Sequence, residues 1–161
     1  MRILGVDPAL SITGYGVIEF KNNRSMLIEA GIVRTNAKEG LASRLNKIYQ
    51  ALLKLIDEVK PDVLVLEKLY AHYRHPTTAY ELGHARGVVC LLCANKNMPL
   101  VEYAATRVRK AILGRGNASK LQVQQMVMHI LSLGKVSPKY LDVTDALALA
   151  LAYTNTVRSQ L

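Results

Sequence analysis

The chain has 161 residues, half of them hydrophobic, and it carries 21 Lys and Arg against 12 Asp and Glu, a formal net charge of +9. This length favours one domain spanning residues 1–161, and the apolar content excludes a disordered chain. No apolar run is long enough to span a membrane, and the strand-like start MRILGVD is unlike a signal peptide, so we expect a cytoplasmic protein. The positive charge favours nucleic acid as partner over an anionic membrane, with a solvated surface as the alternative.

The first third of the chain predicts three strands. Their short connections, such as PALSIT after the first strand, favour antiparallel neighbours. Beyond them the pattern alternates: the stretch 40–60 has apolar residues at helical spacing, and the run DVLVLEK is typical of a strand that is covered on both faces. We therefore expect an α/β fold with a mixed central sheet flanked by helices. The predicted strands are 2–7, 14–20, 26–34, 62–68 and 99–103, and the later helices are 76–96, 105–113, 118–132 and 139–157.

Two cysteines, Cys90 and Cys93, lie in the apolar helical stretch GVVCLLCANK. Their spacing is compatible with a zinc or redox site, but a zinc site needs two further ligands close by. We therefore expect both side chains to pack in the core.

Four acidic residues stand out against the apolar segments that carry them. Asp7 and Glu67 each end a predicted strand, and Asp142 and Asp145 lie three residues apart on one face of the last helix. Unpaired buried carboxylates are costly, so each must protonate, pair with Lys or Arg, cap a turn, or bind a metal ion. Four such oxygen donors suit Mg²⁺ or Mn²⁺, and a pair of these ions stabilises both oxygens of a phosphodiester displacement. The acids thus predict either a metal-dependent phosphodiesterase or a structural set of ion pairs.

Several segments resemble, in order and over nearly the whole chain, the RuvC family of Holliday-junction resolvases. The segments are ILGVDP, TGYGVIE, VLVLEKLY, LGHARGVV, PLVEYAATRVRK, SKLQVQQMV and DVTDALALALAY. The resemblance implies an RNase H-like fold with a five-stranded mixed sheet whose first three strands are antiparallel. It also implies a homodimer that makes paired symmetric nicks in four-way DNA junctions during recombination and repair. Whether the RuvA–RuvB branch-migration complex docks on the chain stays open.

By this similarity Asp7, Glu67, Asp142 and Asp145 correspond to the catalytic acids that bind Mg²⁺, or Mn²⁺ in its place, as two ions per site. The nucleophile would be a metal-activated water, and the products would carry 5′-phosphate and 3′-hydroxyl ends. The chain departs from the family at Ala9, where a glycine is usual, so we expect an ordinary backbone conformation there. At the position of Asp142 the family also uses histidine.

The resemblance further assigns DNA contacts. Tyr70 is expected to stack on bases near the crossover, with Tyr73 as competitor, and Arg74 adds charge to the same loop. The other expected contacts are Arg109 and Lys120 near the scissile phosphate, and Arg115.

Arg107 and Lys110 fit a solvated helix face better, because one helix cannot direct them and Arg109 to the same side. Two rival functions remain: a nuclease of the same fold acting on RNA–DNA hybrids, and a junction-binding protein without catalysis.

Overall fold

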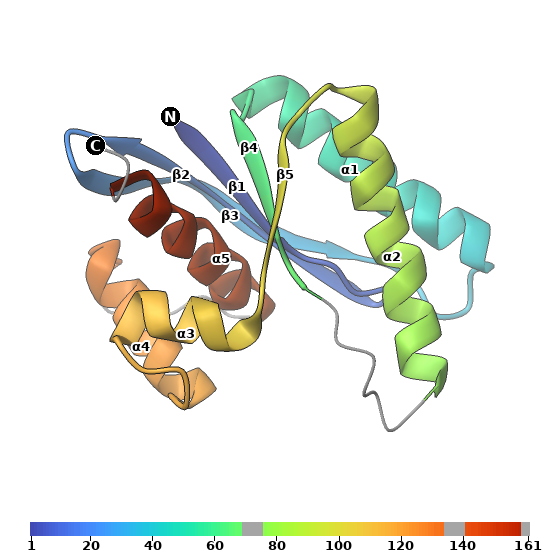
Figure 1. Cartoon of the computed structure of the whole chain (residues 1–161). Coiled ribbons are helices and arrows are strands. Elements are labelled where there is room, and N and C mark those ends of the chain that lie inside the picture. Colours follow the sequence, from blue (N-terminus) through green and yellow to red (C-terminus); the bar gives the residue numbers. More distant parts are fainter. Residues whose placement is uncertain (69–75, 134–140, 159–161) are drawn as a thin grey trace.

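The computed structural model describes residues 1–68, 76–133 and 141–158. Its centre is a five-stranded sheet with the strand order β3-β2-β1-β4-β5 (Figure 1). β1 (Arg2–Asp7), β2 (Ile12–Lys21) and β3 (Arg24–Arg34) are antiparallel neighbours, while β4 (Val63–Glu67) and β5 (Leu100–Tyr103) run parallel to β1. The mixed sheet with three antiparallel strands first, predicted from the sequence, is confirmed.

The connection between β2 and β3 is a tight hairpin. Its two loop residues, Asn22 and Asn23, have φ values of 51° and 61°. Asparagine tolerates this left-handed conformation better than most residues, and two such residues in succession match the twist of an antiparallel pair. The hairpin therefore sets the register of β2 and β3 next to the loop, up to the shift between Val17 and Ile18.

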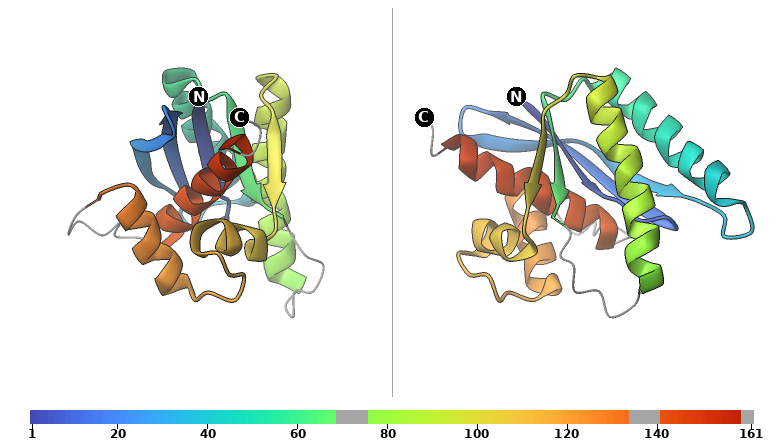
Figure 2. Two further views of the ribbon diagram at one scale, coloured as in Figure 1. Left: turned by 60° about the vertical axis from the view of Figure 1, so that its left-hand side comes forward. Right: turned by 45° about the vertical axis from the view of Figure 1, so that its right-hand side comes forward.

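Helices cover both faces of the sheet. α1 (Leu41–Val59) and α2 (Pro76–Asn95) lie on one side. α3 (Ala105–Leu113), α4 (Lys120–Ile130) and α5 (Leu141–Arg158) lie on the other, as the two views of Figure 2 also show. Because successive strand residues point to opposite faces, each strand supplies two cores. In β1, Ile3 packs with α3, α4 and α5, whereas Leu4 and Val6 pack with α1 and α2.

The two cysteines of α2 differ in how deeply they are buried in the core. Cys93 is buried with Val89 and Leu92, and Cys90 is half-buried at the edge of the same cluster. Burial raises the pKa of the Cys93 thiol to about 11, so the thiolate that binds metals or exchanges disulfides is scarce at neutral pH. The predicted packing role of Cys93 is confirmed.

α5 lies unusually close to β1 and β2. A Cβ added to Gly5 would overlap the carbonyl oxygen of Ala146, and one added to Gly14 would overlap the backbone of Asp142. Only glycine permits this approach of helix to strand. The first turns of α5 are therefore held against the strand ends that carry the predicted acids.

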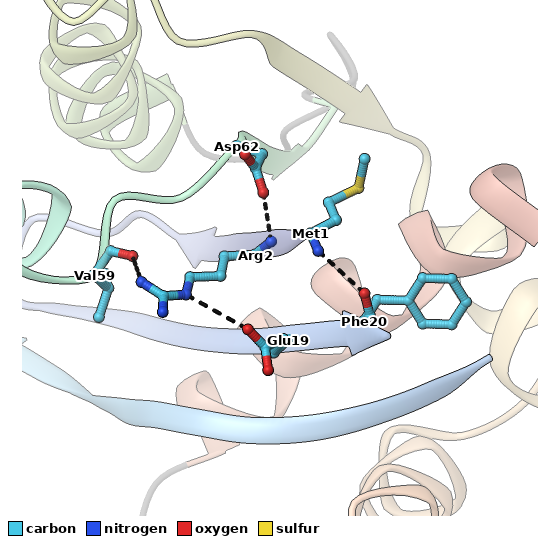
Figure 3. A network of polar contacts seen from close by, with 6 residues as sticks. All are labelled: Met1, Arg2, Glu19, Phe20, Val59 and Asp62. Atoms are coloured by element: carbon cyan, nitrogen blue, oxygen red, sulfur yellow. Dashed lines mark hydrogen bonds and ion pairs between the residues drawn. The ribbon is translucent and has the colours of Figure 1, made fainter. Parts of the chain in front are cut away.

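The opposite end of β1 is anchored by a polar network (Figure 3). The Arg2 guanidinium donates to the carbonyl oxygen of Val59 at 2.7 Å and lies 3.8 Å from Glu19, and the Arg2 amide donates to Asp62 at 2.6 Å. The Met1 amino group donates to the carbonyl of Phe20 at 3.1 Å. These contacts join the starts of β1 and β4 to the end of β2. Within the described ranges, no helix has the length and apolar character needed to cross a membrane.

Candidate functional site

Three of the predicted acids line one cavity. Asp7 and Glu67 end the parallel neighbours β1 and β4, whose preceding residues Val6 and Leu66 are paired, so both side chains emerge at the same edge of the sheet. Asp145 reaches this edge from the second turn of α5. The cavity has a volume of about 170 Å³, and its lining residues are Asp7, Pro8, Glu67, Leu82, Arg86, Lys120 and Asp145. A second hollow of about 100 Å³ adjoins it and shares Glu67, Lys120 and Asp145.

Asp142 lies beside this site but outside both cavities. Its backbone packs on Gly14, the residue paired with Asp7 in the β1–β2 ladder. Its charge contributes to raising the pKa of Asp7. The structure therefore brings Asp142 into electrostatic range of Asp7, one helical turn away from Asp145.

The pKa of Asp7 is the most perturbed in the group. It is raised from 3.8 to about 7, first by burial and then by the charges of Asp145, Glu67 and Asp142, while Lys120 acts in the opposite direction among the described residues. Partial burial also raises the pKa of Glu67, with Asp145 adding to the effect and with Lys120 and Arg109 opposing it. The site thus holds more negative charge than its own cations offset, which is the condition under which carboxylates bind an external cation.

Lys120 is the described cation that pairs directly with one of the acids. Its ammonium donates to the Asp145 carboxylate at 2.9 Å, and this hydrogen bond raises the pKa of Lys120. Its position follows from the start of α4. Ser119 caps the helix by accepting from the Gln122 amide, and the Gln122 side chain accepts from the Ser119 amide in return. Lys120 is therefore the first residue of a helix whose beginning is fixed.

The three basic residues of α3 point to different sides of the helix, as their spacing predicts. Arg109 is half-buried and lines the second hollow with Glu67 and Asp145. Arg107 and Lys110 are exposed and line a different hollow with Asn155 of α5, and the Arg107 guanidinium stacks 4.3 Å from the centre of the Tyr103 ring. Only Arg109 of the three faces the acids.

The chemistry of the described carboxylates suits a divalent cation, but their arrangement is not that of a complete metal site. Carboxylates are hard oxygen donors, which are the ligands that Mg²⁺ and Mn²⁺ select. In the part of the chain that the structure describes, however, no three His, Cys, Asp or Glu side chains are arranged to hold a metal ion, and the Lys120 ammonium pairs with one of the acids. Four converging carboxylates were expected from the sequence. The structure gathers three in one cavity, with a lysine among them.

Other predicted residues have varied positions. Tyr70 and Arg74, together with the competitor Tyr73, lie outside the described residues. Arg115 is exposed in the connection between α3 and α4, directly after Gly114, whose φ of +75° ends α3. Ala9 has no positive φ, as expected, and exchanges hydrogen bonds with the Thr13 hydroxyl.

One charged residue of the cavity was not predicted from the sequence. Arg86 extends from α2, donates to the main-chain carbonyl oxygen of Glu67 at 2.6 Å, and forms an ion pair with Glu102 of β5. Its signal was an arginine inside an otherwise apolar helical stretch, where an unpaired charge would be costly.

Comparisons with known proteins agree with this architecture. The family model described as crossover junction endodeoxyribonuclease RuvC matches residues 3–153. Crossover junction endodeoxyribonuclease RuvC of Desulforamulus reducens is 44% identical over 95% of this chain and 93% of its own length, and that of Alkaliphilus oremlandii is 42% identical over 97% and 94%.

Among solved structures, RuvC of Thermus thermophilus in complex with a Holliday-junction substrate superposes with a TM-score of 0.92 at 29% identity, covering 99% of this chain and 96% of that one. The fold predicted by resemblance is therefore confirmed, and the chain belongs to the RuvC family of crossover junction endodeoxyribonucleases.

Proposed function

We propose that this chain resolves four-way DNA junctions by paired, symmetric hydrolytic nicks, in homologous recombination and DNA repair. The observation that carries the proposal is the cavity at the sheet edge. Asp7, Glu67 and Asp145 line it, and it belongs to a chain of net charge +9. The basic surface attracts the polyanion, and the acids supply the negative site where metal-dependent phosphodiester chemistry takes place. The T. thermophilus relative, solved with a Holliday junction, supports this choice of substrate.

In this proposal Asp7, Glu67, Asp142 and Asp145 are the residues that hold Mg²⁺, or Mn²⁺ in its place, as two ions per site. When bound, such ions lower the pKa of a water molecule and stabilise the charge that develops on the phosphate. The chain's own residues prepare the site. The pKa of Asp7 is raised by burial and then by the neighbouring carboxylates, whose negative charge a divalent cation would offset. The reaction of water with the phosphodiester would leave 5′-phosphate and 3′-hydroxyl ends.

The basic residues around the acids are suited to hold DNA. Lys120 lines both cavities and keeps two-thirds of its side chain exposed, so its ammonium can reach a phosphate at the mouth. Arg109 lines the second hollow together with Glu67, and Arg115 is exposed just after the end of α3. We assign these three to the sugar–phosphate backbone, where contacts set affinity and position rather than sequence choice. Tyr70 and Arg74 keep their proposed roles at the crossover.

We also propose that two copies associate through the outer face of α2. Along this face Tyr80 and Leu91 are exposed, by 63% and 55%. Between them lie Gly83 and Gly87, where an added Cβ would meet no atom within 4 Å. The spacing places all four on one stripe of the helix, apolar and with room for a neighbour. A twofold contact needs one such self-complementary patch, and it would set the distance between the two cuts.

The decisive assay compares three substrates: a synthetic four-way junction, a linear duplex and an RNA–DNA hybrid, each incubated with Mg²⁺ or with EDTA. We expect paired nicks in the junction alone, only with metal, and sealed again by DNA ligase because the ends are 5′-phosphate and 3′-hydroxyl. The Asp7→Asn variant should bind the junction and fail to cut it. A hybrid cut faster than the junction would favour the rival nuclease, and binding without cutting would favour the non-catalytic protein.

A further inference from the structure

Arg86 connects three elements at the edge of the acid cavity. It lies midway along α2, and its side chain is only 12% exposed. One guanidinium nitrogen donates to the main-chain carbonyl oxygen of Glu67 at 2.6 Å, and another pairs with the carboxylate of Glu102. A single planar group therefore links α2 to the end of β4 and to β5.

The peptide group between Glu67 and Lys68 is held on both sides. Its carbonyl oxygen accepts from Arg86, and its N–H donates to the carbonyl oxygen of Tyr103 at 2.8 Å. This peptide is the last one of β4 that the structure describes. Because both polar groups are engaged, rotation of the backbone on the carboxyl side of Glu67 is restricted, and the direction of its side chain is restricted with it.

The contact is geometric rather than electrostatic. The charge of the Arg86 guanidinium is offset by Glu102, and its hydrogen bond goes to the backbone of Glu67, not to the carboxylate. The cations that lower the pKa of Glu67 are Lys120 and Arg109. Arg86 thus acts on where the carboxylate lies, while the other two act on its charge.

We propose that Arg86 is a positioning residue that holds Glu67 in the geometry needed to bind a divalent metal, and that it ties this geometry to α2. The proposal rests on the proposed function of Glu67 as a ligand. Partners that orient a metal ligand typically change metal affinity by about 10–100-fold when they are removed. Gly87 of the outer face of α2 directly follows Arg86 in the chain. Association of two copies at that face would therefore also affect the position of Glu67 through Arg86.

The test uses Arg86→Lys, which keeps the charge but loses the planar fork that reaches two acceptors at once. Its matched control is Arg2→Lys, because Arg2 also donates to one carbonyl, that of Val59, and faces one glutamate, at the far end of β1 (Figure 3). In metal-free, DNA-free protein, the amide of Lys68 should exchange its hydrogen at least about tenfold faster in R86K and at an unchanged rate in R2K.

The second readout is the midpoint of a Mn²⁺ titration followed by electron paramagnetic resonance, without DNA. We expect it to rise about 10–100-fold in R86K. Unchanged Lys68 exchange or an unchanged Mn²⁺ midpoint overturns the proposal. So does weaker junction binding in EDTA by Arg86→Gln, which removes the charge, if its salt slope is reduced by about one, the signature of a direct phosphate contact.

Glu102→Gln provides a second route if R86K does not fold. It leaves Arg86 in place but weakens its other anchor, so Lys68 exchange and the Mn²⁺ midpoint should shift in the same direction by a smaller factor. The absence of both shifts in E102Q contradicts the proposal. If the wild-type protein fails to cut junctions, the proposed function falls while both readouts still test Arg86. If it cuts them and R86K has a wild-type Mn²⁺ midpoint, only this inference falls.

Discussion

Replacing Asp7 by asparagine should stabilise the metal-free protein at alkaline pH, although it removes a proposed metal ligand. The pKa of Asp7 is 3.8 in the unfolded chain and about 7 in the folded one, raised first by burial and then by the neighbouring carboxylates. At 1.36 kcal/mol for each tenfold change, this gap makes the ionised residue unfavourable by at most about 4 kcal/mol. A marginally stable domain has only about 5–15 kcal/mol in total.

The sign of the effect depends on pH. Below pH 3.8 Asp7 is protonated in both states, so it does not affect stability. As the pH rises from 3.8 to about 7, the unfolded chain releases its proton while the folded one keeps it, and stability is lost over this window. Asparagine resembles the protonated acid, and any cost of its amide is the same at every pH. The advantage of Asp7→Asn over the wild type should therefore grow by about 3 kcal/mol between pH 4.5 and pH 8.

The assay is urea unfolding in EDTA at both pH values, repeated with Mg²⁺ at pH 8. Metal at a concentration of 100 times Kd should stabilise the wild type by about 2.7 kcal/mol, and the variant by much less. The advantage of Asp7→Asn in free energy of unfolding should therefore become smaller or change sign. Asp57→Asn is the control, because Asp57 is exposed on α1 and pairs with Lys96. An advantage of Asp7→Asn that does not change with pH would refute the reasoning, since Lys120 would then compensate Asp7 fully.

Three further predictions concern packing, assembly and the basic residues. Gly5→Ala should lower the free energy of unfolding by about 1–3 kcal/mol in urea, because the new Cβ meets the backbone of α5, whereas Gly40→Ala, with open space around it, should cost less than about 1 kcal/mol. Leu91→Asp should convert the proposed dimer to a monomer in analytical ultracentrifugation; a monomeric wild type would contradict the assigned face. Arg109→Ala should slow single-turnover cutting of a saturating junction by about 100-fold, whereas Lys110→Ala should mainly alter the salt dependence of junction binding. Equal losses of cutting rate in the two variants would contradict the different directions of these side chains.

The order and type of the elements follow from the sequence because hydrophobic spacing is local. The ends were less predictable. β2 begins at Ile12 rather than residue 14, since Ile12 and Thr13 pair with β3 and the buried Thr13 hydroxyl donates to the carbonyl of Ala9. α4 begins at Lys120 rather than residue 118, and here the signal was present: Ser119 followed by Gln122 is a capping box. The ends of strands are decided by pairing with neighbouring strands, and the propensity of a single segment carries no information about that pairing.

The acids of the site were predictable because a carboxylate ending an apolar strand is visible without coordinates. The neighbours that shape the site were not. Gly5 and Gly14 look like ordinary strand glycines until α5 is placed on them, and Arg86 looks like a helix charge until its two acceptors are known. Each depends on a contact between segments far apart in the sequence. Donor chemistry can thus be predicted from the sequence alone, but donor geometry needs the fold.

The pair of Lys120 with Asp145 explains how an acidic cavity persists in the free protein. Among the described residues, three carboxylates raise the pKa of Asp7 and Lys120 is the group that lowers it. The Lys120 side chain is two-thirds exposed, so the pair contributes little to stability and can open at small cost. If the acids bind a metal ion as we propose, a weak internal counter-ion suits the site, because a buried, rigid lysine would compete with the metal. We expect Lys120→Met to bind Mg²⁺ at least as tightly as the wild type while losing affinity for junction DNA. Weaker Mg²⁺ binding in that variant would mean that Lys120 organises the acids rather than substituting for a cation.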